Sequence, residues 1–156
     1  MRKHSASVFV SLASLHKGGN ITGEIWLEVA GFAFPERRWS DFPVIILGWW
    51  LDALFKLWSG KKKRIECLCL FMDGPYGFEV SGEKDAYVLR CYRDPFDTRE
   101  CEWEGAISLT NLLRQVLDAA SIIIKECRRQ GWATKDLEAL ESRWVYMDGV
   151  LNPQSV

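Results

Sequence analysis

The sequence predicts an α+β fold with an antiparallel sheet of about five to six strands, a central buried helix and two C-terminal helices. Three observations lead to this class. Short segments typical of strands, several of them with alternating apolar and polar residues, recur between residues 8 and 104. Apolar side chains recur at helical spacing after residue 108, and the stretch 41–59 has almost no polar side. Strands grouped together, with helices outside the group, predict helices packed on one face of the sheet.

The chain has the size and composition of one compact domain. It holds 156 residues, of which 48% are hydrophobic and 26% charged, so it is globular in type rather than disordered. No stretch has the composition of a linker, and we expect one domain over residues 1–156. The net charge of −1 gives no overall attraction to nucleic acid or anionic lipid, so neither is expected as a partner.

Two strands are expected before the first helix. Residues 8–12 alternate and are followed by a Gly-Gly turn. Residues 24–29 have a clearer period of two, with one apolar and one polar face. The polar face carries Glu24, Trp26 and Glu28. Residues 31–38 are expected to form a loop that leads to the helix.

Residues 41–59 are expected to form one helix. Ser40 or Asp41 can cap the first turn, Pro43 is tolerated at a helix start, and Gly60 suits a left-handed stop. Because apolar side chains surround the helix, we expect protein to cover it on nearly all sides. The few positions predicted to face solvent are Ile45, Trp49, Asp52 and Lys56.

The remaining elements follow from alternation and from capping residues. We expect strands at 65–72, 76–80, 85–93 and 98–104, the second and third joined in a hairpin. Ser108 can cap a long helix that Gly131 ends. Thr134 can cap a shorter helix, expected to be finished by Gly149 and Pro153.

The apolar run 42–51 raises a membrane alternative, but its length argues against it. A spanning helix needs roughly 20 predominantly apolar residues, and Asp52 and Lys56 interrupt this one sooner. The N-terminal residues lead into an alternating segment without the apolar core of a signal peptide. We therefore expect no membrane contact and a cytoplasmic location.

The cysteines and histidines predict no cofactor, metal or catalytic centre. An odd number of cysteines without paired C-x-x-C spacing favours reduced thiols in a reducing compartment. They are Cys67, Cys69, Cys91, Cys101 and Cys127. His4 and His16 are the only histidines, and no phosphate, dinucleotide, serine-elbow or zinc-hydrolase motif occurs. A non-enzymatic protein is the expectation.

One cluster keeps an enzyme or a small-ligand protein as an alternative. Asp73 and Tyr76 lie in an Asp-Gly-Pro-Tyr segment after a predicted strand. Together with Tyr92 they are the residues expected to line a pocket in this alternative. Asp-Gly-Pro is also a common turn sequence, and a turn with a packed tyrosine is the commoner explanation.

Rows of glutamates supply the candidate binding residues. On a strand, Glu100, Glu102 and Glu104 would line one face, as Glu24 and Glu28 would on theirs. Solvated sheet faces are the commoner explanation of such rows. The functional interpretation is an acidic surface with Trp26 near it, which attracts a basic protein and repels nucleic acid.

Residues 25–35, 39–51 and 71–76 resemble a pattern found in small bacterial proteins, some of which are immunity partners of secreted toxins. The resemblance covers a minority of the chain and brings no functional residues with it. It implies a small cytoplasmic α+β protein that acts by blocking another protein.

These observations together predict a non-enzymatic protein-binding module of immunity or inhibitor type. It would occlude a partner toxin with a basic surface, through contact residues Glu24, Trp26, Glu28, Glu100, Glu102 and Glu104. Besides the enzyme alternative, a structural subunit that covers Ile45 and Trp49 by forming a homodimer also remains open.

Overall fold

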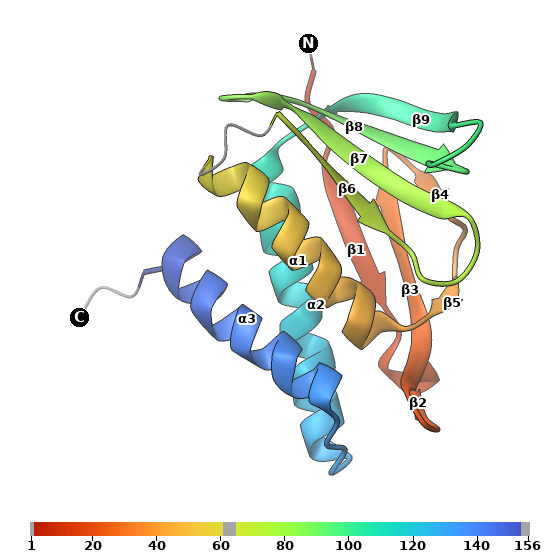
Figure 1. Cartoon of the computed structure of the whole chain (residues 1–156), viewed down its shortest axis with the longest axis vertical. Coiled ribbons are helices and arrows are strands. Elements are labelled where there is room, and N and C mark those ends of the chain that lie inside the picture. Colours follow the sequence, from red (N-terminus) through yellow and green to blue (C-terminus); the bar gives the residue numbers. More distant parts are fainter. Residues whose placement is uncertain (1, 61–64, 154–156) are drawn as a thin grey trace.

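The computed structural model describes residues 2–60 and 65–153, which form three helices and two antiparallel sheets (Figure 1). This arrangement confirms the α+β class and the order of the helices. The helices are α1 (Pro43–Ser59), α2 (Leu109–Arg129) and α3 (Lys135–Leu151). The strands are β1 (Ala6–Val10), β2 (His16–Lys17), β3 (Ile21–Val29), β4 (Phe32–Phe34), β5 (Ser40–Asp41), β6 (Glu66–Leu70), β7 (Tyr76–Glu83), β8 (Ala86–Arg93) and β9 (Glu100–Ile107), with a 3-10 turn at Leu12–Ser14.

The five-stranded sheet is built around β3. β1 pairs along one side of β3, the short strands β4 and β5 pair on the other side, and β2 pairs with the first residues of β3. The outer edge of β1 is covered by α2, where the Gln115 side chain accepts the backbone N–H of Val8 at 3.4 Å. The segment 31–38, expected to be a loop, contains β4. Because this segment folds back, β4 pairs with β3, which then has an antiparallel neighbour on each side.

The strands divide into two sheets, which differs from the single sheet of five to six strands expected. Because β4 and β5 occupy the second side of β3, no edge of β3 is left for β6. Strands β6 to β9 instead form a four-stranded antiparallel meander. A single bridge between His4 and Ile107 joins the N-terminal segment to β9, and the His4 N–H donates to the Ala106 carbonyl at 2.8 Å.

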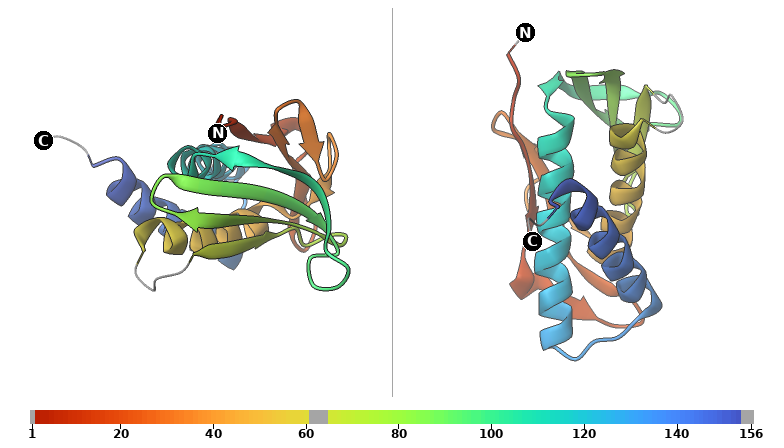
Figure 2. Two further views of the ribbon diagram at one scale, coloured as in Figure 1. Left: turned by 90° about the horizontal axis from the view of Figure 1, so that it is seen from above. Right: turned by 90° about the vertical axis from the view of Figure 1, so that its left-hand side faces the viewer.

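The helices lie together on one face of the five-stranded sheet, and the four-stranded sheet lies across one end of α1 and α2 (Figures 1 and 2). α1 occupies the centre and contacts α2, α3, β3 and β6. Trp50 is fully buried, and its indole N–H donates to the Leu70 carbonyl at 2.7 Å. The predicted central helix is therefore confirmed. None of the described helices is both long and apolar enough to cross a membrane.

One side of α1 faces solvent, as its sequence predicted. Ile45 is half-buried and Trp49 is 41% exposed. On the same side, the Nε–H of Arg143 on α3 donates a hydrogen bond shared between the two Asp52 carboxylate oxygens, at 2.9 and 3.0 Å. This charged contact fixes α3 against the least apolar side of α1.

Most predicted helix ends are confirmed. Ser108 accepts the N–H of Asn111 at the start of α2, and Thr134 accepts the N–H of Leu137 at the start of α3. α1 stops at Gly60, which has a left-handed φ of 67°. The last helix, expected to be finished by Gly149 and Pro153, continues past the glycine and ends at Leu151, two residues before the proline. Burial of Leu151 offsets the cost of a helical glycine, about 1 kcal/mol.

Candidate protein-binding surface

The outer face of the five-stranded sheet carries a stacked aromatic pair. Residues of β3 alternate between buried and half-buried, and Trp26 belongs to the half-buried, outward row. Phe9 lies opposite Trp26 in the register of β1 and β3, and the two rings stack with centroids 5.5 Å apart. Phe9 is 42% exposed. An apolar pair therefore stands on a sheet face that the helices do not cover.

Glu24 and Glu28 flank this pair, but each lies beside an arginine. Arg38 contacts Glu24 at 3.3 Å and Arg37 contacts Glu28 at 3.6 Å. Glu28 also accepts the indole N–H of Trp26 at 2.9 Å, which fixes the orientation of the ring. The arginine side chains are 65–75% exposed, whereas the glutamates are about one-fifth exposed. This face is of mixed charge, and its outermost charges are positive, contrary to the predicted anionic row.

The three glutamates of β9 do not form one row. Glu104 pairs with Arg90 and Glu100 with Arg93, although the two glutamates are four positions apart and the two arginines only three. The extra residue on β9 is a bulge between these pairs. Arg90 and Arg93 are an odd number of positions apart, so their partners Glu104 and Glu100 lie on opposite faces. The prediction of three carboxylates on one face is therefore wrong.

Arginines also neutralise much of the acidic charge on the four-stranded sheet. Arg90 hydrogen-bonds Glu104 at 2.6 Å, and this bond raises the pKa of the guanidinium. Arg99 bonds Glu79 at 2.9 Å, while Arg93 contacts Glu102 at 3.3 Å. The result is a network of ion pairs across β7, β8 and β9, which belongs to a different sheet from Trp26.

Trp103 of β9 packs against the N-terminal segment. It pairs with Cys91 in the register, and its half-buried ring meets the His4 ring edge to face at 5.4 Å. It therefore packs against the N-terminal segment and does not extend the outer face that carries Trp26.

A second surface feature lies where the turn after β6 meets the loop after β8. A hollow of about 210 Å³ is lined mainly by apolar side chains of these two segments. We call it the Tyr76 hollow and define it by Leu70, Phe71, Pro75, Tyr76, Pro95 and Phe96. Phe96 is 78% exposed, the most exposed of the large apolar side chains described. Sequence reasoning missed it, although an apolar residue between Pro95 and Asp97 in a polar turn was a visible signal.

The Tyr76 hollow does not have the character of a catalytic pocket. Tyr76 lines it, whereas Asp73 is exposed outside the lining and Tyr92 is buried. Its volume is below the roughly 300–1,000 Å³ of small-molecule sites. The three residues named for the enzyme alternative are thus not brought together around one cavity.

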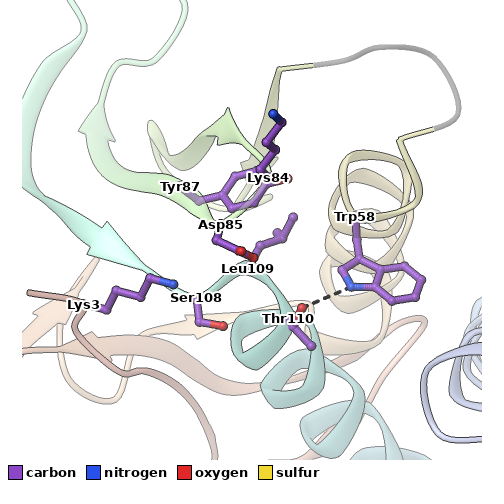
Figure 3. A pocket seen from close by; sticks show the side chains of 8 residues that line it. All are labelled: Lys3, Trp58, Lys84, Asp85, Tyr87, Ser108, Leu109 and Thr110. Carbon is purple, nitrogen blue, oxygen red and sulfur yellow. Dashed lines mark hydrogen bonds between the residues drawn. The ribbon is translucent and has the colours of Figure 1, made fainter. Parts of the chain in front are cut away.

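A polar hollow of about 190 Å³ lies near the start of α2 (Figure 3). The Asp85 carboxylate lies beside Leu109 at the start of the helix, Lys3 reaches toward Ser108, and Lys84 extends away (Figure 3). Acidic side chains are favoured at this positive end of a helix. The negative charge favoured at this end of α2 is therefore supplied by Asp85 of the same chain. Thr110 accepts the indole N–H of Trp58 at 3.2 Å on the opposite wall.

The described residues contain no group of three or more His, Cys, Asp and Glu side chains placed to hold a metal ion. Asp41 is the one buried charged residue among them, and its carboxylate accepts hydrogen bonds only from groups of this chain. Comparisons with protein-family models, with curated proteins and with solved structures found no match to this chain.

Proposed function

We propose that this protein is a cytoplasmic protein-binding module of immunity or inhibitor type, which blocks a partner protein by covering its surface. The stacked Phe9 and Trp26 on the outer face of the five-stranded sheet are the observation that carries the proposal. Partly exposed aromatic side chains are the usual anchors of protein interfaces, and a polar rim around them is typical.

The surroundings of Trp26 support this role. Its ring is held by the bond to Glu28 and by the stack on Phe9, so little side-chain freedom is lost on binding. Arg37 and Arg38 extend outward beyond Glu24 and Glu28, which provides charges of both signs at the rim. Such a rim favours a partner with its own mixed charges and makes the association rate sensitive to salt.

The glutamates of β9 form a second, separate part of the proposed contact surface. Glu100, Glu102 and Glu104 lie along the edge strand of the four-stranded sheet. Because Arg90 and Arg93 pair with two of them, a basic partner must compete with these arginines. We assign them a smaller contribution than that of the aromatic pair.

The test is affinity capture with the whole chain as bait, followed by a measured dissociation constant for the protein it retains. The product of an adjacent reading frame is the first partner to try. We expect Trp26→Ala to weaken binding about tenfold or more, as for other interface anchors, without a comparable loss of thermal stability. Val145→Ala, a change of an exposed apolar residue on α3, is the matched control. Unchanged binding by Trp26→Ala would remove this surface from the proposal.

Charge reversal at Glu100 and Glu102 tests the second part. We expect weaker, more salt-sensitive capture if the β9 edge contributes, and unchanged capture if it does not.

Self-association is the second candidate, and the exposure of Trp49 favours it. Val145 and Tyr146 of α3 are 60% and 58% exposed, and α3 packs against α1 beside Trp49. A homodimer would cover these side chains. Light scattering at increasing concentration should then report a dimer, which Trp49→Glu converts to a monomer; a monomer at every concentration would exclude this candidate.

A further inference from the structure

We propose that the Tyr76 hollow is an anchoring subsite that takes one apolar side chain from a basic segment of a partner protein. This inference rests on the proposed function, because it assigns a second contact point to the same kind of interaction. It also specifies the chemistry of the partner: a phenylalanine, leucine or similar side chain, with lysine or arginine beside it.

The size and lining of the hollow fit a single side chain. Its volume of about 210 Å³ is too small for most small-molecule ligands, whose sites span roughly 300–1,000 Å³. Three aromatic rings and two prolines supply most of the wall. Rigid apolar pockets of this kind receive the anchors of protein interfaces, since an inserted side chain loses its water without leaving polar groups unpaired.

The outer wall is held in place by its own loop. The Asp94 N–H donates to the Pro75 carbonyl at 2.7 Å, and the Arg99 N–H returns to the Asp94 carbonyl at 2.9 Å. Both Asp94 and Arg99 have φ of 52°, a conformation that non-glycine residues adopt only where their surroundings impose it. Phe96 is thus presented to solvent on a fixed loop, and its exposure does not result from a lack of local structure.

The floor is held by packing from the other sheet. Tyr76 meets the Phe34 ring at 5.7 Å and the Trp39 ring at 5.2 Å, both edge to face. A Cβ added at Gly74 would lie 3.0 Å from the Trp39 ring, so the turn and that ring are in close contact. The hollow is therefore formed before any partner arrives, which lowers the entropic cost of binding.

The rim selects a basic partner. Asp94 and Asp97 line the hollow. Of the neighbouring arginines, Arg99 bonds Glu79, whereas Arg93 contacts Glu102 and lies over the Tyr76 ring at 5.7 Å. Within the described residues neither Asp94 nor Asp97 forms an ion pair, so the two rim carboxylates attract a cation next to an inserted apolar side chain and disfavour an acidic segment.

The first test uses short capped peptides as probes, Lys-Phe-Lys and Glu-Phe-Glu, titrated into the labelled whole chain and followed by amide chemical shifts. We expect Lys-Phe-Lys to move signals of residues 74–77 and 94–98, with a dissociation constant at least tenfold lower than that of Glu-Phe-Glu. Phe96→Ser should weaken Lys-Phe-Lys about tenfold. Shifts scattered over the surface, equal binding of the two peptides, or no effect of Phe96→Ser would overturn the proposal.

A charge variant separates the rim from the wall. Asp94→Asn with Asp97→Asn keeps the shape, and asparagine tolerates the left-handed φ of Asp94. This variant should lose the preference for the lysine peptide while still accepting phenylalanine. A retained preference would show that the carboxylates do not select the partner.

The captured partner distinguishes this inference from the proposed function. If Trp26→Ala weakens binding of the captured partner and Phe96→Ser does not, the proposed function holds and the proposed subsite is wrong. If both variants weaken it, both proposals hold. If no partner is found while Lys-Phe-Lys binds at the hollow as expected, the binding function fails and the subsite's chemistry stands.

Discussion

The carboxylate of Asp41 accepts the backbone N–H of Asp73 at 3.1 Å, from a residue 32 positions later in the chain. The same carboxylate accepts the indole N–H of Trp39 at 2.9 Å and the backbone N–H groups of Phe42 at 2.7 Å and Met72 at 3.3 Å. Asp41 is 2% exposed. One buried side chain therefore joins the start of α1 to the turn that forms the floor of the Tyr76 hollow.

Replacement of Asp41 by alanine should strongly destabilise the protein. It leaves four partly buried donors without their acceptor, and bonds to a charged group are worth about 1.5–3 kcal/mol each. Because the site can relax, we expect a loss of about 3–5 kcal/mol in the free energy of unfolding, measured by urea denaturation.

Asp73→Ala is the matched control for that measurement. Asp73 contributes only its backbone N–H to Asp41, and its own side chain is exposed. Its free energy of unfolding should stay within about 0.5 kcal/mol of the starting protein. Equal stability of the two variants would mean that the Asp41 carboxylate does not hold the turn.

Asp41 also marks a limit of what the sequence predicts. Its position before Pro43 predicted a helix cap, but this prediction is wrong: the cap residue of α1 is Phe42, and no side chain makes a capping hydrogen bond there. The Asp41 carboxylate instead accepts the N–H of Phe42, just before the helix. Its bonds to Met72 and Asp73 could not be predicted, because local spacing carries no information about a partner some 30 residues away. The helices themselves were predicted well, because helical periodicity and most cap residues depend only on neighbours within one turn.

The candidate site shows the same division. Alternation placed Trp26 with Glu24 and Glu28 on one face of β3, because that strand is regular. Alternation failed on β9, where a bulge inserts one residue and sends Glu100 to the other face from Glu104. The sequence also gave no sign that Arg37 and Arg38 fold back to Glu28 and Glu24, since that contact requires β4 and β5 to pair with β3.

Two adjacent tryptophans should differ widely in their effect on stability. Trp50 is fully buried, donates to the Leu70 carbonyl and meets the rings of Phe71 and Phe78, each at 5.0 Å. Trp50→Phe removes that hydrogen bond and leaves a cavity, so we expect a loss of about 2–3 kcal/mol in the free energy of unfolding.

Trp49→Phe is the control, because its side chain is 41% exposed on the next position of the helix. Its effect should be below about 0.5 kcal/mol in the same denaturation experiment. A larger loss for Trp49 than for Trp50 would contradict the orientation of α1 described above.

The reactivity of the cysteines should follow burial and pH together. All five thiols are free, and only Cys101 is exposed. Burial raises the pKa of Cys127 to about 11 and also raises that of Cys91, so neither forms much thiolate near neutral pH. Loss of hydration, with the nearby Glu104 carboxylate, raises the pKa of Cys101 as well. The thiolate is the reacting form. Because the pKa of Cys101 is raised, its alkylation rate should still increase at pH values where the rate of a free cysteine has levelled off.

Iodoacetamide at pH 8 should therefore modify one site first, and mass spectrometry should place it at Cys101. Cys101→Ser should abolish the fast phase, and denaturant should expose the remaining four thiols. Rapid modification of Cys91 or Cys127 in the native protein, or a rate that levels off by about pH 8.5, would contradict this account.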